Sequence, residues 1–257
     1  AAAVSCPKLY ISSGVNPNNV VMLDSRGVLN NKRNDLNKIK QQFITNRNID
    51  TLEEAMVGAD VFLGLSIGNV VSKKMIRSMA NDPIVFAMAN PNPEISYDDA
   101  TAARNDIIMA TGRSDYPNQI NNVLGFPFIF RGALDVRASI INEEMKMAAA
   151  NALANLAKEY VPEMVAKAYN QQNIVFGKDY IIPKPLDHRL ITAVAPAVAK
   201  AAMESGVARE PIEDWDDYKN QLSKRLGYEN ALIRSITEKA KQNPKRVVFA
   251  EANNLKM

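Results

Sequence analysis

The chain has 257 residues, of which 47% are hydrophobic and 23% charged, which is ordinary for a globular protein and enough for one large or two small domains. The net charge of +3 is too small to indicate binding to nucleic acid or to an acidic membrane surface. The single cysteine, Cys6, rules out an internal disulfide, and no apolar run approaches the roughly 20 residues of a membrane span. No basic region precedes an apolar segment at the N-terminus, so we expect a cytoplasmic protein.

The first residues predict a helix followed by a short strand. Residues 1–13 have a helical pattern, although Pro7 is expected to limit the helix to a turn or two, and Gly14 is a suitable C-terminal cap. Residues 20–23 (VVML) predict a buried strand with Asp24 at its end. Helix, strand and acid in this order are typical of the second half of the first βαβ unit of a Rossmann fold, where the acid binds ribose hydroxyls.

Asp24 and the basic residues after it each have two interpretations. A lone aspartate after a strand is also a common turn former. Arg26, Lys32 and Arg33 follow Asp24, and basic side chains at this place could accommodate the 2′-phosphate of NADP. The alternative is a solvated loop and helix start, which charge alone favours.

The pattern then alternates helices with short apolar strands. Helices are predicted at residues 35–43, from residue 51 and at residues 72–80, and strands at residues 61–63, 83–89 and 107–110. With residues 20–23 this makes four strands, which predict an α/β fold with a Rossmann-type, doubly wound parallel sheet. Right-handed crossovers would bring Asp24, Gly64, Asn90 and Gly112 to one edge, where open α/β sheets bind their ligands.

The loops at these strand ends have compositions that suit a ligand. Gly64 and Gly68 allow close approach to the backbone, although many strand ends look like this. Pro91 keeps Asn90 extended, so that its amide is expected to point into the crevice; an ordinary Asn-Pro turn is the alternative.

Residues 111–135 (TGRSDYPNQINNVLGFPFIFRGALD) form the most informative stretch. A polar loop leaves the predicted strand and passes through Gln119, Asn121 and Asn122 before an apolar segment. Side-chain amides donate and accept hydrogen bonds without carrying charge. Paired amides at this place suit a small ligand with hydroxyl and carboxylate oxygens.

This stretch closely resembles the ATGRSDYPNQ-NN-FPFIFRGALD signature of bacterial malic enzymes, and YIIPKP (180–185) and VAPAVAKAAMESGVA (194–208) are also similar to that family. Malic enzymes oxidatively decarboxylate malate to pyruvate with NAD or NADP and a divalent metal. The resemblance implies that the substrate contacts Asn90, Asn121 and Asn122. Arg26 is added to the cofactor contacts as a possible partner of a 2′-phosphate. The expected cofactor contacts are then Asp24, Arg26, Gly64, Ser66, Asn90, Gly112 and Asn121.

The resemblance also implies what this chain does not carry. In the family, the catalytic Tyr and Lys, the Glu-Asp-Asp metal ligands and the Gly-rich turn all precede the residues matched here. The acid pairs of this chain, such as Asp98-Asp99, suit helix starts better than a metal site. We therefore expect no catalytic residue and no metal ligand in this chain, Mg²⁺ or Mn²⁺ held mainly by residues outside it, and no activity of this chain alone.

The second half predicts helices. One is expected from residue 142 to 158 and another from 189 to 206, and His188 between them is expected to be structural or solvent-exposed. An amphipathic helix is predicted at 218–241. Residues 244–251 (PKRVVFAE) resemble the entry strand of phosphate acetyltransferases, to which some malic enzymes are fused.

The expected organisation is a Rossmann-like NAD(P)-binding domain at 1–150, a helical part of the malic enzyme region at 151–215, and a linker helix with the start of an acetyltransferase-like domain at 216–257. Because the chain begins without Met and a strand starts just before it stops, we expect a piece of a longer protein. We also expect a homo-oligomer, although the apolar residues 194–203 could equally be core.

Two alternatives to this function stay open. The chain could be a non-catalytic dinucleotide-binding regulatory module, because acid, base and metal residues are missing. It could also be the cofactor domain of an amino-acid dehydrogenase, against which the Asn pair and the acetyltransferase-like tail argue. The sequence favours NADP over NAD without deciding between them.

Overall fold

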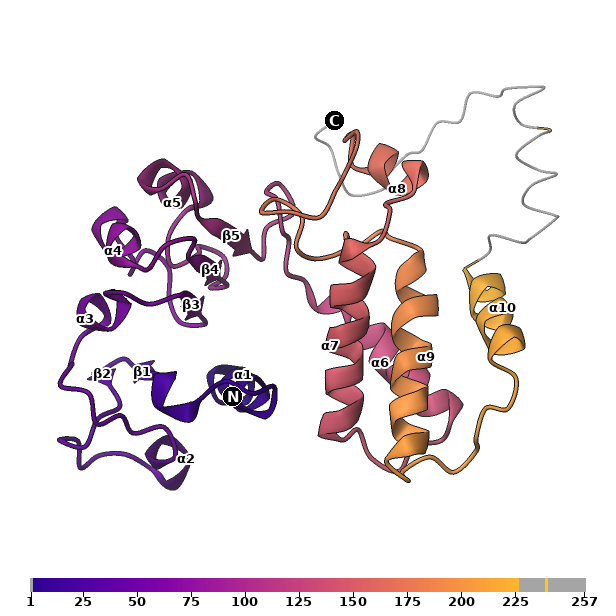
Figure 1. Cartoon of the computed structure of the whole chain (residues 1–257), viewed down its shortest axis with the longest axis horizontal. Helices are drawn as coiled ribbons and strands as arrows, with labels where there is room; N and C mark the ends of the chain where they lie inside the picture. Colours follow the sequence, from indigo (N-terminus) through magenta and orange to yellow (C-terminus); the bar gives the residue numbers. More distant parts are fainter. Residues whose placement is uncertain (1, 227–238, 240–257) are drawn as a thin grey trace, which may run out of the picture. The chain divides into compact units, whose positions relative to one another are not determined.

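The computed structural model describes residues 2–226 and residue 239 (Figure 1). The chain divides into two units, Ala1–Pro211 and Ile212–Met257. Within the described residues, no helix combines the length and the apolar character needed to cross a membrane.

The first described element is helix α1, Ala2–Ser12, and Gly14, two residues after its end, has φ of +104°. Pro7 lies inside this helix, so the prediction that it would limit the helix to a turn or two is wrong. The reason is tertiary packing: α1 lies against an apolar cluster through Val4 and Ile11. Burial of these side chains offsets the backbone hydrogen bond that proline cannot make.

The residues around Asp24 form a hairpin outside the parallel sheet. Strand β1 (Leu23–Asp24) pairs antiparallel with β2 (Gly27–Val28) in a two-stranded sheet. The Asp24 Oδ1 atom accepts a hydrogen bond from the Arg26 backbone N–H at 2.9 Å, and Gly27 has φ of +106°. This tight turn reverses the chain, so the prediction of a fourth parallel strand at residues 20–23 is wrong.

Among the described residues, three strands form the parallel sheet in the order β3-β4-β5. They are β3 (Val61–Gly64), β4 (Ile84–Ala87) and β5 (Ile108–Thr111). Each was predicted from its apolar run, and this part of the fold prediction is confirmed. Helix α3 (Leu52–Met56) precedes β3, and α4 (Lys73–Ser78) and α5 (Tyr97–Ala103) lie between the strands. These helices begin at side-chain caps from Thr51, Ser72 and Ser96. Short helix α2, Lys38–Gln41, lies earlier in the chain.

The core of this α/β part is apolar. Buried residues from the strands and the helices share one cluster that includes Ile76, Val85, Ala87 and Met109. Val85 and Ala87 of β4 are buried and Ile84 and Phe86 are half-buried, so one face of this strand is covered more completely than the other.

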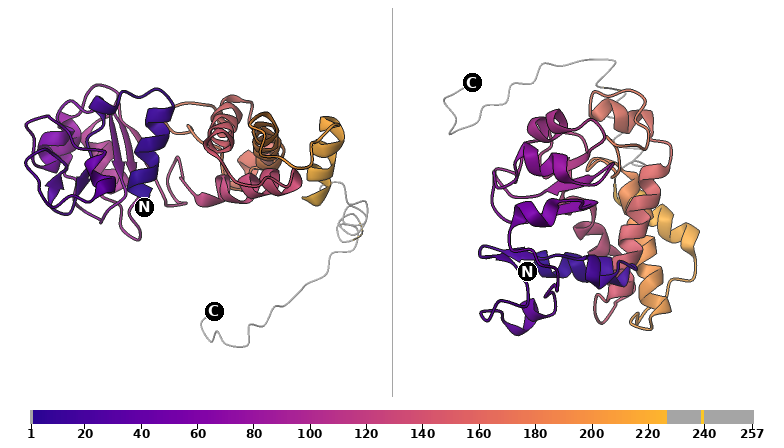
Figure 2. Two further views of the ribbon diagram at one scale, coloured as in Figure 1. Left: turned by 90° about the horizontal axis from the view of Figure 1, so that it is seen from below. Right: turned by 60° about the vertical axis from the view of Figure 1, so that its left-hand side comes forward.

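The regular elements described after β5 in the first unit are helices. They are α6 (Phe126–Asp135), α7 (Glu143–Lys158), α8 (Glu163–Ala168) and α9 (Arg189–Glu204), with a short 3₁₀ turn η2 (Asn122–Leu124) before α6. Helices α7 and α9 pack side by side, and α6 packs on α9 (Figures 1 and 2). A Cβ atom built on Gly132 would lie 2.4 Å from the Ala195 carbonyl oxygen, so only glycine allows α6 to approach α9 this closely.

The second unit contributes helix α10, Trp215–Arg225, which is capped by Asp214. The predicted helix at 218–241 therefore begins three residues earlier than expected. Its C-terminal part and the acetyltransferase-like segment at 244–251 lie outside the described residues.

Candidate functional site

The ends of the three parallel strands lie in register at one edge of the sheet. Gly64 is paired with Ala87, and Ala87 with Thr111. The loops that follow these residues therefore start side by side, including the loops that carry Ser66, Asn90 and Gly112. This is the edge at which open α/β sheets bind ligands.

Gly64 and Ser66 meet a residue that sequence reasoning did not select, Glu94. The Glu94 side chain is completely buried, and its Oε1 atom accepts hydrogen bonds from Ser66 N–H at 2.8 Å and from Ser66 Oγ at 3.3 Å. A Cβ atom on Gly64 would lie 2.3 Å from the Glu94 carboxyl carbon. The absence of a side chain at Gly64 therefore leaves room for Glu94. That this glycine also lets a ligand approach the backbone closely stays a prediction.

Asn90 is exposed at the end of the β4 strand, and its bond to Pro91 is cis. The residue before it, Ala89, donates its backbone N–H to Glu94 Oε2 at 3.0 Å. Asn90 thus extends from a backbone that a buried carboxylate holds, with its own side chain at the surface.

The polar loop after β5 returns to the strand that it leaves. Ile120 N–H donates to the Thr111 carbonyl oxygen at 2.8 Å, which places the residues after Ile120 beside Gly112. Asn121 Oδ1 accepts from Val123 N–H at 3.0 Å and so caps η2. Asn121 and Asn122 are both exposed.

The buried amide of this loop is Asn118, another residue that sequence reasoning missed. Its Nδ2 atom donates to the carbonyl oxygens of Met109 at 3.1 Å and Lys178 at 2.6 Å, and its Oδ1 accepts from Ile181 N–H at 2.8 Å. Asn118 is 2% exposed and has φ of +53°, a conformation that asparagine tolerates better than most residues. This side chain fixes the loop, whereas Asn121 and Asn122 are exposed on its surface.

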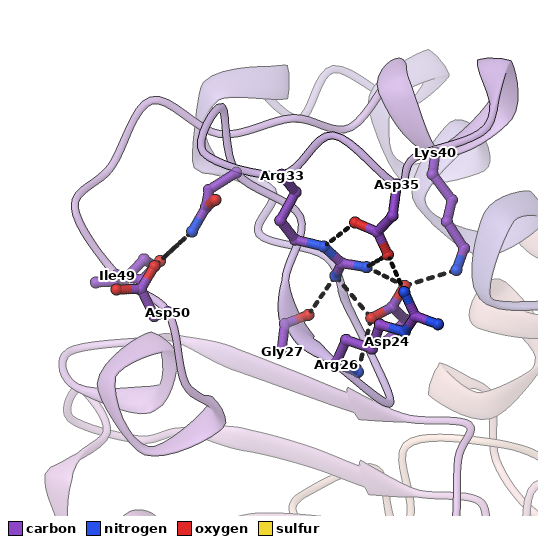
Figure 3. Close-up of polar contacts among 9 residues, drawn as sticks. Asp24, Arg26, Gly27, Arg33, Asp35, Lys40, Ile49 and Asp50 are labelled. Carbon is purple, nitrogen blue, oxygen red and sulfur yellow. Dashed lines mark hydrogen bonds and ion pairs between the residues drawn. The ribbon is translucent and has the colours of Figure 1, made fainter.

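Asp24 lies in a cluster of charged side chains (Figure 3). Arg33 donates to both Asp24 oxygens, at 2.7 and 3.1 Å, and Lys40 Nζ lies 2.6 Å from Asp24 Oδ2. Arg33 also pairs with Asp35 at 2.8 Å, and Arg26 pairs with Asp35 at 2.9 Å. Three cations therefore surround two carboxylates.

These hydrogen bonds stabilise the charged form of the carboxylates. The Arg33 guanidinium, with Lys40 and the Arg26 N–H, holds the pKa of Asp24 well below its usual range, although partial burial opposes this. The Arg33 guanidinium likewise lowers the pKa of Asp35 to about 2.

Lys32 does not belong to the Asp24 cluster. It pairs with Asp50 at 3.0 Å, and Asp50 lies apart from Asp24 in Figure 3. Of the three basic residues selected from the sequence, Arg26 and Arg33 thus face the cluster and Lys32 does not.

The donor set of the cluster fits a phosphorylated ribose. The Asp24 oxygens already accept from Arg33 and Lys40, whereas the Arg26 side chain is 72% exposed and the Lys40 side chain 38%. Exposed guanidinium and ammonium groups suit a phosphate. For a metal the fit fails, since residues 2–226 bring no three His, Cys, Asp or Glu side chains into a possible binding group.

A parallel sheet whose strand ends gather at one edge, with a charged hairpin after the first helix, defines a dinucleotide-binding α/β domain. The family model for the malic enzyme NAD-binding domain matches residues 10–170. The chain belongs to the malic enzyme family and contains its dinucleotide-binding part.

Relatives and solved structures agree with this assignment. The NADP-dependent malic enzyme of Rhizobium meliloti is 54% identical over 100% of this chain and 34% of its own length, and the NAD-dependent malic enzyme of the same organism is 45% identical over 99% and 33%. The crystal structure of Entamoeba histolytica malic enzyme matches 96% of this chain and 49% of its own with a TM-score of 0.74 at 35% identity. The chain thus spans about a third of the length of these Rhizobium relatives.

Proposed function

We propose that this chain binds NADP and malate as part of an enzyme that oxidatively decarboxylates malate to pyruvate. The observation that supports this most is the shared register of Gly64, Ala87 and Thr111, which gathers the selected loops at one edge. A cytoplasmic location, a homo-oligomer and an acetyltransferase-like domain in the parent chain remain parts of this proposal.

In this proposal the cofactor lies along the strand ends. Gly64, Ser66 and Gly112 belong to the loops that would contact it, and the Asp24 hairpin would hold its adenosine ribose. When bound, NADP accepts the hydride from C2 of malate. The chain's own residues bind and orient the two partners.

The charged hairpin supports NADP over NAD. The ribose hydroxyls of NAD need free carboxylate oxygens, but Arg33 and Lys40 already occupy those of Asp24. A 2′-phosphate would instead meet the exposed cations Arg26 and Lys40.

Malate would be oriented by uncharged amides. Asn90, Asn121 and Asn122 are exposed on loops that start at the same edge, and their amides suit the hydroxyl and carboxylate oxygens of malate. We assign no proton-transfer group and no metal ligand to this chain, and we propose that Mg²⁺ or Mn²⁺ is held mainly by residues outside it.

The first test is reduced-cofactor formation by this polypeptide with malate, Mn²⁺ and either NADP or NAD. We expect no rate from the chain alone and recovery, with NADP preferred, when the N-terminal portion of the Rhizobium relative is supplied in trans. A measurable rate from the chain alone would overturn the proposal that the proton-transfer groups and the metal ligands lie outside this chain. Cofactor binding without any malate-dependent reduction in the reconstituted sample would support the regulatory module instead.

The second test concerns Asn122. In the reconstituted or full-length protein, Asn122→Ala should raise the KM for malate about tenfold, as expected for the loss of a hydrogen bond to a charged group, while the KM for NADP changes little. Asn105→Ala, an exposed asparagine before β5, is the matched control. An unchanged malate KM in Asn122→Ala would contradict the assignment.

A further inference from the structure

The loops after β3 and β4 interlock over a short distance. Asn69 N–H donates to the Pro93 carbonyl oxygen and Val71 N–H to that of Glu94, both at 3.0 Å. A Cβ atom on Gly68 would lie 2.7 Å from Asn92 Cβ. The two loops therefore pack directly on each other.

Glu94 is the polar centre of this contact. One of its carboxyl oxygens faces Ser66 on the β3 loop, and the other faces the N–H of Ala89 on the β4 loop. The side chain is 0% exposed. A fully buried carboxyl group is seldom found in proteins unless hydrogen bonds satisfy it, and here every observed contact is one in which it accepts.

We propose that Glu94 is a positioning residue that sets Asn90 relative to the Gly64–Ser66 loop, and so aligns malate with the cofactor. This inference rests on the proposed function. Glu94 touches neither ligand itself, because its carboxyl group is enclosed beneath the two loops. It acts through Ala89, the neighbour of Asn90, on one side and through Ser66 on the other.

The chemistry of the two contacts predicts an asymmetric effect of Glu94→Gln. The glutamine amide has one accepting oxygen and one donating NH₂ group. Its oxygen is expected to face Ser66, where it satisfies both an N–H and a hydroxyl group, which leaves the NH₂ group against the N–H of Ala89. The variant should therefore lose the hydrogen bond to Ala89, the neighbour of Asn90, and keep the hydrogen bonds to Ser66.

The test is steady-state kinetics of the full-length protein that contains these residues. Glu94→Gln should raise the KM for malate about tenfold, the effect of losing one charge-assisted hydrogen bond, while the KM for NADP stays within about threefold. Glu53→Gln, an exposed glutamate on α3, is the matched control.

Hydrogen exchange supplies a measurement that needs no ligand. In the wild type the Ala89 N–H should exchange much more slowly than that of exposed Gly112, and in Glu94→Gln the protection of Ala89 should fall while that of Ser66 persists. The wild-type measurement stands even if the variant does not fold.

The outcomes separate the two proposals. Fast exchange of Ala89 in the wild type, or an active Glu94→Gln enzyme with an unchanged malate KM, would overturn the positioning role alone. An equal rise of both KM values would also overturn it, because a general loss of structure predicts that result. A wild-type protein that binds no nicotinamide cofactor would overturn the proposed function, and the positioning role with it.

Discussion

Because Gly64 has no side chain, the buried carboxyl group of Glu94 can pack directly against it. Because the Glu94 carboxyl group fills the space beside Gly64, Gly64→Ala should lower the free energy of unfolding by about 1–3 kcal/mol, the usual effect of overpacking. Gly177→Ala is the control, since a Cβ atom there meets nothing within 4 Å. Urea unfolding measures both variants.

The same pair allows a double-mutant cycle. If the clash with Glu94 is the cause, Gly64→Ala should be less harmful in a Glu94→Ala background than in the wild type. Additive effects would show that the Gly64 substitution acts on something else.

The Asp24 carboxyl group provides a prediction in acid. Its pKa lies far below the usual value, so the charged cluster contributes stability that is fully present above about pH 4, the ordinary aspartate pKa, and is lost as the pH falls toward the pKa of the folded state. Arg33→Met should move the pKa of Asp24 upward. An NMR titration of the carboxyl carbon measures the shift, and Arg77→Met, at an exposed position on α4, is the control.

We expect a substitution of Lys40 to change the cofactor preference. Lys40→Met should weaken NADP binding more than NAD binding, because in the proposed function the Lys40 ammonium group would interact with the 2′-phosphate that only NADP carries. Fluorescence titration with NADPH and NADH measures the two dissociation constants. Lys38→Met, two residues away and exposed, should leave both unchanged.

At the scale of elements, the approach of α6 to α9 depends on Gly132. A side chain there would press on the Ala195 backbone and on Val198, neither of which can rotate away. We expect Gly132→Ala to destabilise the protein by about 1–3 kcal/mol. Gly125→Ala, at the start of the same helix, meets its nearest atom at 3.5 Å and should be much milder in thermal unfolding.

How well an element could be predicted depended on where its determinants lie. The strands β3, β4 and β5 were predicted within one or two residues because each is a short apolar run between turn residues. The segment at 20–23 was assigned to the wrong sheet, because the turn at Asp24 and Gly27, and not its apolar character, decides its partner. Helix α6 was not predicted, because Pro127 and Gly132, two residue types that weaken a helical pattern, lie within it.

In the candidate site, too, residues in local motifs could be predicted and residues with distant partners could not. The exposed amides Asn90, Asn121 and Asn122 belong to local motifs and could be selected from the sequence. Glu94 and Asn118 could not, because their partners, such as Ser66 and Lys178, lie far away along the chain. A glutamate a few residues after an Asn-Pro turn gives no sign of burial.

At the scale of the whole molecule, Asn118 ties the sheet to a later segment of the first unit. It joins β5 through Met109 to residues 178–181 with three hydrogen bonds. Asn118→Ala would leave buried backbone groups without partners, and we expect a loss of several kcal/mol, at about 1–3 kcal/mol for each group. Asn105→Ala is the control, and equal stability of the two variants by urea unfolding would contradict this role.

The interlocked loops after β3 and β4 also limit how this protein can be redesigned. A loop taken from a relative to change the ligand would bring its own residue at position 64 or 94, but not the partner that fits it. Residues 64–71 and 88–94 therefore need to be exchanged together, with both loops taken from the same relative. A chimera that takes only one of the two should fail at the stage of folding, before any question of specificity is reached.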